Sequence, residues 1–192
     1  MKKVLLLLAN GFEIYEASAF IDVIGWNLVD GDKSTQLFTC GLTKEVKSSF
    51  DQRFVVDLTL DQIDPEEFVA LAIPGGFEEY DFYRDAYSKE FSDLIMRFVQ
   101  RDKLIASICT GALPIAKSGA LTGKRGTTYN MNPIRHKRLR ELGVEVVNEP
   151  VVVSGKIITS WNPSTAMDVA FLLLERLTTT ANTAKLKTLM GF

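Results

Sequence analysis

The stretch Lys-Leu-Ile-Ala-Ser-Ile-Cys-Thr-Gly, residues 103–111, decides the fold, because an apolar strand pattern changes there into a helical one. Residues 104–108 are typical of a buried strand, and apolar residues then recur at helical spacing. Small residues, Ser107 and Gly111, lie two positions either side of Cys109 and allow a tight turn. The pattern predicts a nucleophile elbow, a strained strand-to-helix turn that presents the Cys109 side chain.

The position of Cys109 suggests a reactive thiol. A helix N-terminus favours negative charge, so the helix that follows is expected to lower the pKa of this thiol. The alternative is a buried structural cysteine, since free cysteines are commonly buried. The other cysteine, Cys40, ends a predicted strand and is expected to be a core thiol. We expect no structural disulfide between two cysteines so far apart in a cytosolic chain.

Strand and helix patterns alternate along the whole chain. Strands are predicted at residues 4–9, 35–40, 69–73, 104–108, 125–129, 144–147, 151–153 and 156–160, with a short hairpin within 48–58. Helices are predicted around residues 17–24 and 91–99, after Asn132-Pro133 and Asn162-Pro163, and at about 181–190. This order predicts an α/β fold with a mostly parallel central sheet between two helical layers, in a single domain over residues 1–192.

Composition narrows the classes of function. The chain has 192 residues, 46% hydrophobic and 24% charged, which is typical of a globular protein. A net charge of -2 argues against binding to nucleic acid or to an anionic membrane surface. Apolar runs are too short to span a bilayer and no signal peptide is evident, so a cytoplasmic protein is expected. One histidine and the lack of glycine-rich nucleotide motifs predict no metal and no cofactor.

Three of the predicted strands end at the same edge of the sheet. In open parallel sheets, ligands bind beyond the carboxyl ends of the strands. The strands at 4–9, 69–73 and 104–108 would bring residues 10–16, Pro74-Gly-Gly76 and Cys109 to one place. We therefore predict a small-molecule site at this edge.

Four motifs of this sequence resemble those of the ThiJ/PfpI family, the superfamily of the parkinsonism-associated deglycase, which has a class I glutamine amidotransferase-like fold. The motifs occur in the family's order and extend over nearly the whole chain. They are Gly11-Phe-Glu-Ile-Tyr-Glu16, Ile73-Pro-Gly-Gly76, Ile108-Cys-Thr-Gly111 and Thr159-Ser-Trp-Asn-Pro-Ser-Thr-Ala166. In the last motif Asn162 replaces the family's glycine. The resemblance implies a flavodoxin-like three-layer sandwich and a homodimer.

The resemblance also implies roles for the site residues. Cys109 would be the nucleophile, and Glu16 the carboxyl that hydrogen-bonds its sulfur. A carboxylate beside a thiolate is repelled, so one of the pair should keep a proton. From the residues alone, Glu13 fits the first turn of the helix as well as Glu16 does.

The Gly-Gly turn and the aromatic residues after it each allow two interpretations. Gly75 and Gly76 would offer backbone N–H groups to the sulfur or to a substrate oxyanion, although an ordinary turn after a strand explains them equally. Aromatic residues after this turn either line the pocket or pack in the core: Phe77, Tyr80, Phe82 and Tyr83.

The sequence departs from the hydrolytic members of the family, which carry a histidine base directly after the cysteine or at the end of the next strand. Thr110 and Tyr129 stand at these two positions, and we expect both to contact the site. Tyrosine is a poor base at neutral pH, with a pKa near ~10. The only histidine, His136, is predicted on a solvated basic helix face.

These observations leave two classes of function open. The first is a cysteine-dependent enzyme acting on small reactive carbonyl compounds, in glyoxalase or deglycase chemistry, or a hydratase-like enzyme. The second is a non-catalytic oxidative-stress sensor or chaperone-like dimer in which oxidation of Cys109 is the signal. A PfpI-type intracellular peptidase is disfavoured, because a cysteine protease needs a base. A thiazole monophosphate biosynthesis label, which some family members carry by name inheritance, adds no evidence of substrate.

Overall fold

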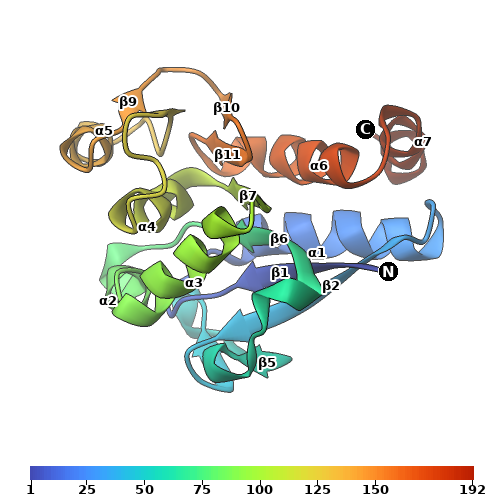
Figure 1. Ribbon diagram of the computed structural model, residues 1–192, viewed down its shortest axis with the longest axis horizontal. Coiled ribbons are helices and arrows are strands. Elements are labelled where there is room, and N and C mark those ends of the chain that lie inside the picture. The colour runs from blue at the N-terminus through green and yellow to red at the C-terminus, as the bar shows by residue number, and fades with distance from the viewer.

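The computed structural model describes residues 1–192 and has a seven-stranded central sheet with helices on both faces (Figure 1). The order of strands across the sheet is β10-β11-β7-β6-β1-β2-β5. These strands are β1 (Lys2–Leu7), β2 (Thr35–Gly41), β5 (Leu58–Thr59), β6 (Phe68–Ile73), β7 (Leu104–Ser107), β10 (Val151–Ser154) and β11 (Ile157–Ser160). All neighbours pair in parallel except the hairpin of β10 and β11, so the predicted fold class is confirmed.

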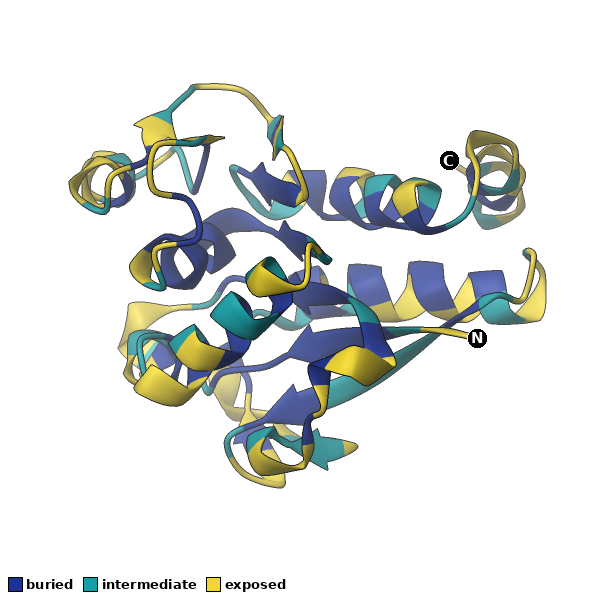
Figure 2. Cartoon of the chain, in the orientation of Figure 1, coloured by how far each residue is buried: buried dark blue, intermediate teal, exposed yellow.

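The two faces of the sheet carry separate cores, because successive side chains of a strand point to opposite faces. In and just after β1, Val4, Leu6 and Leu8 contribute to one core, whereas Leu5, Leu7 and Ala9 contribute to the other. Burial is concentrated in the central strands and on the inner faces of the helices (Figure 2). Helices covering both faces of the sheet therefore explain why residues 4–9 are apolar at every position.

Seven α-helices cover the sheet. They are α1 (Ile14–Val29), α2 (Phe82–Ala86), α3 (Lys89–Gln100), α4 (Ala112–Lys117), α5 (Pro133–Glu141), α6 (Ala166–Leu177) and α7 (Thr180–Met190). Apolar residues of α1 and α6 belong to one core, and those of α3, α4 and α5 to the other. No helix combines the length and apolarity that crossing a membrane requires.

Two segments differ from the sequence prediction. The expected strand at 125–129 shortens to β8 (Arg125–Gly126), which pairs in parallel with β9 (Glu145–Val146) in a separate two-stranded sheet. The hairpin expected within 48–58 is formed by β3 (Glu45–Lys47) and β4 (Arg53–Val55), so it begins before Ser48. Short strands with few apolar residues leave little pattern from which to place their ends.

Candidate functional site

Cys109 lies directly after β7, in a single 3-10 turn over Cys109–Gly111 that leads into α4. Its backbone has φ +55°, in the left-handed region that costs a non-glycine residue roughly 1–3 kcal/mol. At Gly111 a Cβ atom would lie 2.6 Å from the carbonyl oxygen of Ile73, so no larger residue fits. The strained turn predicted from the sequence is therefore present, with the Cys109 side chain 6% exposed.

Glu16 lies in the first turn of α1 and is fully buried. Its Oε2 accepts a hydrogen bond of 2.5 Å from the Gly75 N–H, whereas Oε1 has no partner within the chain. Burial raises the pKa of Glu16 well above its ordinary value, and the charge of Glu13 raises it further. The Gly75 N–H only partly offsets this, so the geometry favours a carboxyl that holds a proton.

The pKa of the Cys109 thiol is also raised well above its ordinary value, which contradicts the lowered pKa expected from the following helix. Burial is the main cause, and the charge of Glu16 adds to it. A hydrogen bond from the backbone N–H of Thr110 lowers this pKa in part. Because α4 spans only six residues, its dipole is a small influence beside burial. The thiol and the carboxyl together therefore hold a proton at neutral pH.

The turn after β6 contacts both the carboxyl and the elbow. The N–H of Gly75 donates to Glu16, and the N–H of Gly76 donates to the Thr110 hydroxyl over 2.9 Å. The N–H groups of Gly75 and Gly76 were expected to face the sulfur or a substrate oxyanion, and both instead bond to side chains of this chain. A Cβ atom at Gly75 would lie 2.7 Å from Thr110 Oγ1, and one at Gly76 would lie 2.3 Å from the Gly11 carbonyl oxygen. Glycine is required here for close packing of three loops.

A cavity of about 260 Å³ opens beside the elbow. The expected residues Gly76, Cys109, Thr110 and Tyr129 line it together with Glu13, Phe77, Glu78, Glu79, Asn132, Arg135 and Pro163. Gly76 and Cys109 follow two strands that were predicted to end at one edge of the sheet, and Tyr129 lies beside them in the cavity. Of the two acids in the first motif, Glu13 lines the cavity, whereas Glu16 is fully buried and its charge acts on Cys109.

Arg135 is the one cationic residue that lines the cavity, and it was not among the site residues predicted from the sequence. Its guanidinium pairs with Glu78 at 2.8 Å and lies 5.1 Å from the centre of the Tyr83 ring. No pattern distinguishes it from the other basic residues of α5. Of the aromatic residues after the Gly-Gly turn, Phe77 lines the cavity, whereas Phe82 is fully buried.

This geometry can be compared with that of known proteins. The model of the DJ-1/PfpI family matches residues 2–176. The chain belongs to the DJ-1/PfpI family. The crystal structure of Drosophila melanogaster DJ-1beta superposes on it with a TM-score of 0.86 at 27% identity, covering 98% of this chain and 97% of that one.

Relatives of this DJ-1/PfpI chain include proteins named as deglycases. A deglycase of Pyrococcus horikoshii is 35% identical over 109 residues, which are 57% of this chain and 62% of that protein. This match therefore spans less than two thirds of the relative's length. An uncharacterized protein of Staphylococcus aureus is 32% identical over 166 residues, covering 84% of this chain and 90% of that protein.

No histidine lines the cavity of this DJ-1/PfpI protein. His136 is half-buried on α5, with Nε2 3.1 Å from the carbonyl oxygen of Thr128, and not on a solvated face as expected. Ile134 of the same helix is 65% exposed. Thr110 and Tyr129 hold the two positions where hydrolytic members carry a histidine base. The Thr110 hydroxyl bonds to the backbone of Gly76, and Tyr129 lines the cavity.

Iodoacetamide is expected to alkylate Cys109 at least ~10-fold faster than Cys40 at pH 8. Burial raises the pKa of both thiols, but Cys109 lines a cavity that the reagent can enter, whereas Cys40 is fully buried in the core. Since alkylation requires the thiolate, labelling of Cys109 should still rise with pH above 8, because its own pKa is raised. Peptide mass mapping measures both rates, and equal labelling of the two residues would contradict the assignment.

Proposed function

We propose that this protein is a cysteine-dependent enzyme acting on small reactive carbonyl compounds, with Cys109 as nucleophile and Glu16 as its proton partner. The observation that carries the proposal is the strained Cys109 in a 260 Å³ cavity, with a buried carboxyl in its immediate surroundings. This volume lies just below the roughly 300–1,000 Å³ of pockets that hold drug-sized ligands, so the cavity suits a smaller molecule. The names of the Pyrococcus relatives support carbonyl chemistry of the deglycase kind.

The arrangement supports addition of the thiol to a carbonyl group. Glu16 holds a proton in the resting protein, and the fraction of it that is ionised takes the proton of Cys109 as the sulfur bonds to the carbonyl carbon. The π bond of the carbonyl breaks, and its oxygen takes the proton back from Glu16, which leaves a hemithioacetal. This step conserves all atoms and electrons and needs no cofactor. A carboxyl with a raised pKa suits both transfers near neutral pH.

A 2-oxoaldehyde can react further without an external oxidant. The hydrogen on the carbon bound to sulfur moves as a proton to the neighbouring carbon, and the hydroxyl proton of the hemithioacetal moves to the neighbouring carbonyl oxygen. Together these transfers give a thioester of a 2-hydroxy acid. Water then hydrolyses the thioester and releases the Cys109 thiol. Glu16 is the carboxyl placed to move the proton, because its Oε1 has no other partner.

The test is turnover of glyoxal, a glycated amine, an isonitrile and a fluorogenic peptide by the wild-type protein. We expect turnover of glyoxal or of a glycated amine that is lost in Cys109→Ser. Peptide cleavage is expected to be absent, since Thr110 and Tyr129 stand where hydrolytic relatives carry histidine. Cysteine-dependent peptide cleavage without carbonyl turnover would overturn the proposal, and isonitrile turnover alone would replace the substrate class.

The second candidate is an oxidative-stress sensor or chaperone-like homodimer without catalysis. The buried Glu16 favours it, because a protonated carboxyl can donate to an oxidised sulfur. This candidate function requires no substrate turnover. It does require that oxidation of Cys109 changes the mass of the oligomer or the protection of a client protein from aggregation. Light scattering and an aggregation assay before and after peroxide treatment would show neither change if the candidate is wrong.

A further inference from the structure

A second cavity, of about 570 Å³, lies at the opposite edge of the sheet from Cys109. It contains Leu104 and Ile157, the first residues of β7 and β11, whereas Cys109 follows the carboxyl end of β7. The length of β7 separates the two cavities by roughly 13 Å, at about 3.3 Å per residue. They share no lining residue, so this cavity is not part of the site beside Cys109.

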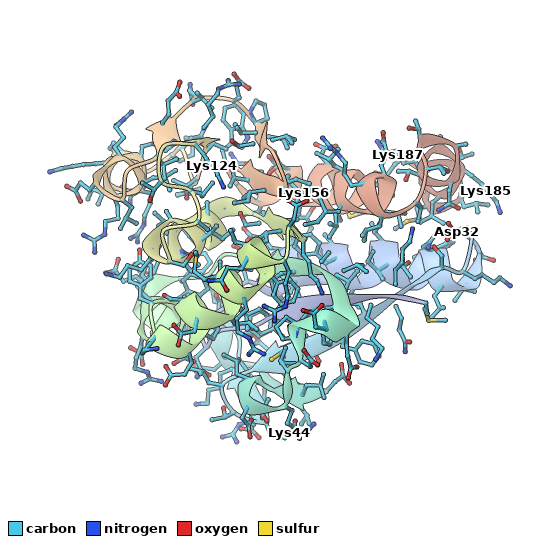
Figure 3. All side chains as sticks on the ribbon, in the orientation of Figure 1. Asp32, Lys44, Lys124, Lys156, Lys185 and Lys187 are labelled. Atoms are coloured by element: carbon cyan, nitrogen blue, oxygen red, sulfur yellow. The ribbon has the colours of Figure 1, made fainter.

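The cavity is strongly basic, although the chain as a whole has a net charge of -2. Four cationic side chains and a single acid, Asp102, line it: Lys103, Lys124, Lys156 and Arg176. The three lysines are the residues immediately before β7, β8 and β11, and the arginine lies in the last turn of α6. Lys124 and Lys156, far apart in the sequence, both lie at this part of the molecule (Figure 3).

Acidic neighbours leave much of this charge uncompensated. Asp102 lies 3.6 Å from Lys156, in an exposed pair that contributes little. Lys103 is 3.8 Å from Glu66, a carboxylate that also pairs with Arg101.

Two of the cations have no acidic partner at all. The Lys124 ammonium donates only to the carbonyl oxygen of Ala120, at 3.0 Å. The Arg176 guanidinium forms neither an ion pair nor a hydrogen bond within the chain. Like charges held together in this way repel one another unless an anion lies between them.

We propose that this cavity binds a small, multiply charged anion of the diphosphate type. Lys124, Lys156 and Arg176 would contact the charged group, and the Ser154 hydroxyl adds a hydrogen-bond donor. The volume lies within the range of small-molecule sites. A concave site that draws its cations from four separate segments suits a compact anion better than an extended polymer. Val99, Leu104 and Ile157 provide an apolar wall for an organic part attached to the phosphates.

Calorimetric titration with inorganic pyrophosphate at an ionic strength of about 0.05 M tests the proposal, because screening is weak there. We expect saturable binding by the wild-type protein, and orthophosphate should bind more weakly because it carries less charge. The Lys124→Gln, Arg176→Gln double variant should bind pyrophosphate at least ~10-fold more weakly. The Lys124→Arg, Arg176→Lys double variant keeps both charges and should stay within about threefold of wild type.

The matched control is the Lys44→Gln, Lys185→Gln double variant, which removes the same charge outside the cavity. Each of these lysines donates to one backbone carbonyl, as Lys124 does. The control should bind pyrophosphate as wild type does, and so should Cys109→Ser. Absence of binding by the wild-type protein, or equal weakening in the control, would overturn the proposal. Binding to anionic vesicles but not to pyrophosphate would overturn it as well, in favour of a membrane surface.

Discussion

Cys109→Ser is expected to lower kcat/KM for the carbonyl substrate by at least ~1000-fold while the fold is kept. The serine hydroxyl is a much weaker nucleophile than a thiol, and a carboxyl such as Glu16 is too weak a base to ionise it. The two side chains have nearly the same shape, so the strained turn at φ +55° should survive. Steady-state kinetics measures the loss, with circular dichroism to confirm folding.

Cys40→Ala is the matched control, because Cys40 is the other free thiol and lies in the opposite core. It should keep turnover within about twofold of wild type, although the lost packing can cost about 1 kcal/mol of stability. Loss of turnover in the Cys40 variant with retention in Cys109→Ser would place the chemistry elsewhere.

The fold could be predicted because its strands carry strong local signals. A strand such as β6 is apolar throughout and ends at Pro74-Gly75-Gly76, where proline and glycine stop the pattern. The elbow could be predicted for the same reason, since Ser107 and Gly111 mark the turn around Cys109. Once the alternation of strands and helices predicts a parallel sheet, the meeting of these loops at one edge follows too.

The electrostatics of the site could not be predicted, because they depend on burial. The sequence places Cys109 before a helix, and only the tertiary structure shows that burial and Glu16 raise its pKa. Likewise, the Gly75 N–H was expected to face the sulfur or a substrate oxyanion, and only the structure shows that it donates to Glu16. Hydrogen bonds between segments 59 residues apart leave no local trace in the sequence.

Glu16 is expected to control how far peroxide oxidises Cys109. If its protonated carboxyl donates to the sulfur, oxidation should proceed to the sulfinate and largely stop, because a charge-assisted hydrogen bond stabilises that form. Glu16→Gln keeps a weaker donor, and Glu16→Asp withdraws the carboxyl by one methylene. Intact mass after graded peroxide should show severalfold less arrested sulfinate, with Asp more severely affected than Gln.

Glu16 should also affect stability in a pH-dependent way. Because burial raises its folded-state pKa above the ordinary value of 4.5, the folded protein keeps a proton that the unfolded chain releases above that pH. The stability from this residue is therefore full below pH 4.5 and declines as the pH rises. The side chain at this position cannot titrate in Glu16→Gln. The free energy of unfolding of the variant should therefore rise relative to that of wild type between pH 4 and pH 7, as measured by urea denaturation at each pH.

Glu13 provides the control that separates the two acids of the first motif. It lines the cavity and its pKa is raised less strongly, whereas Glu16 is fully buried beside the Gly75 N–H. Glu13→Gln and Glu13→Asp should therefore change both the oxidation of Cys109 and the pH dependence of stability less than the Glu16 variants do. If the Glu13 variants alter oxidation and the Glu16 variants leave it unchanged, Glu16 is not the proton partner of Cys109.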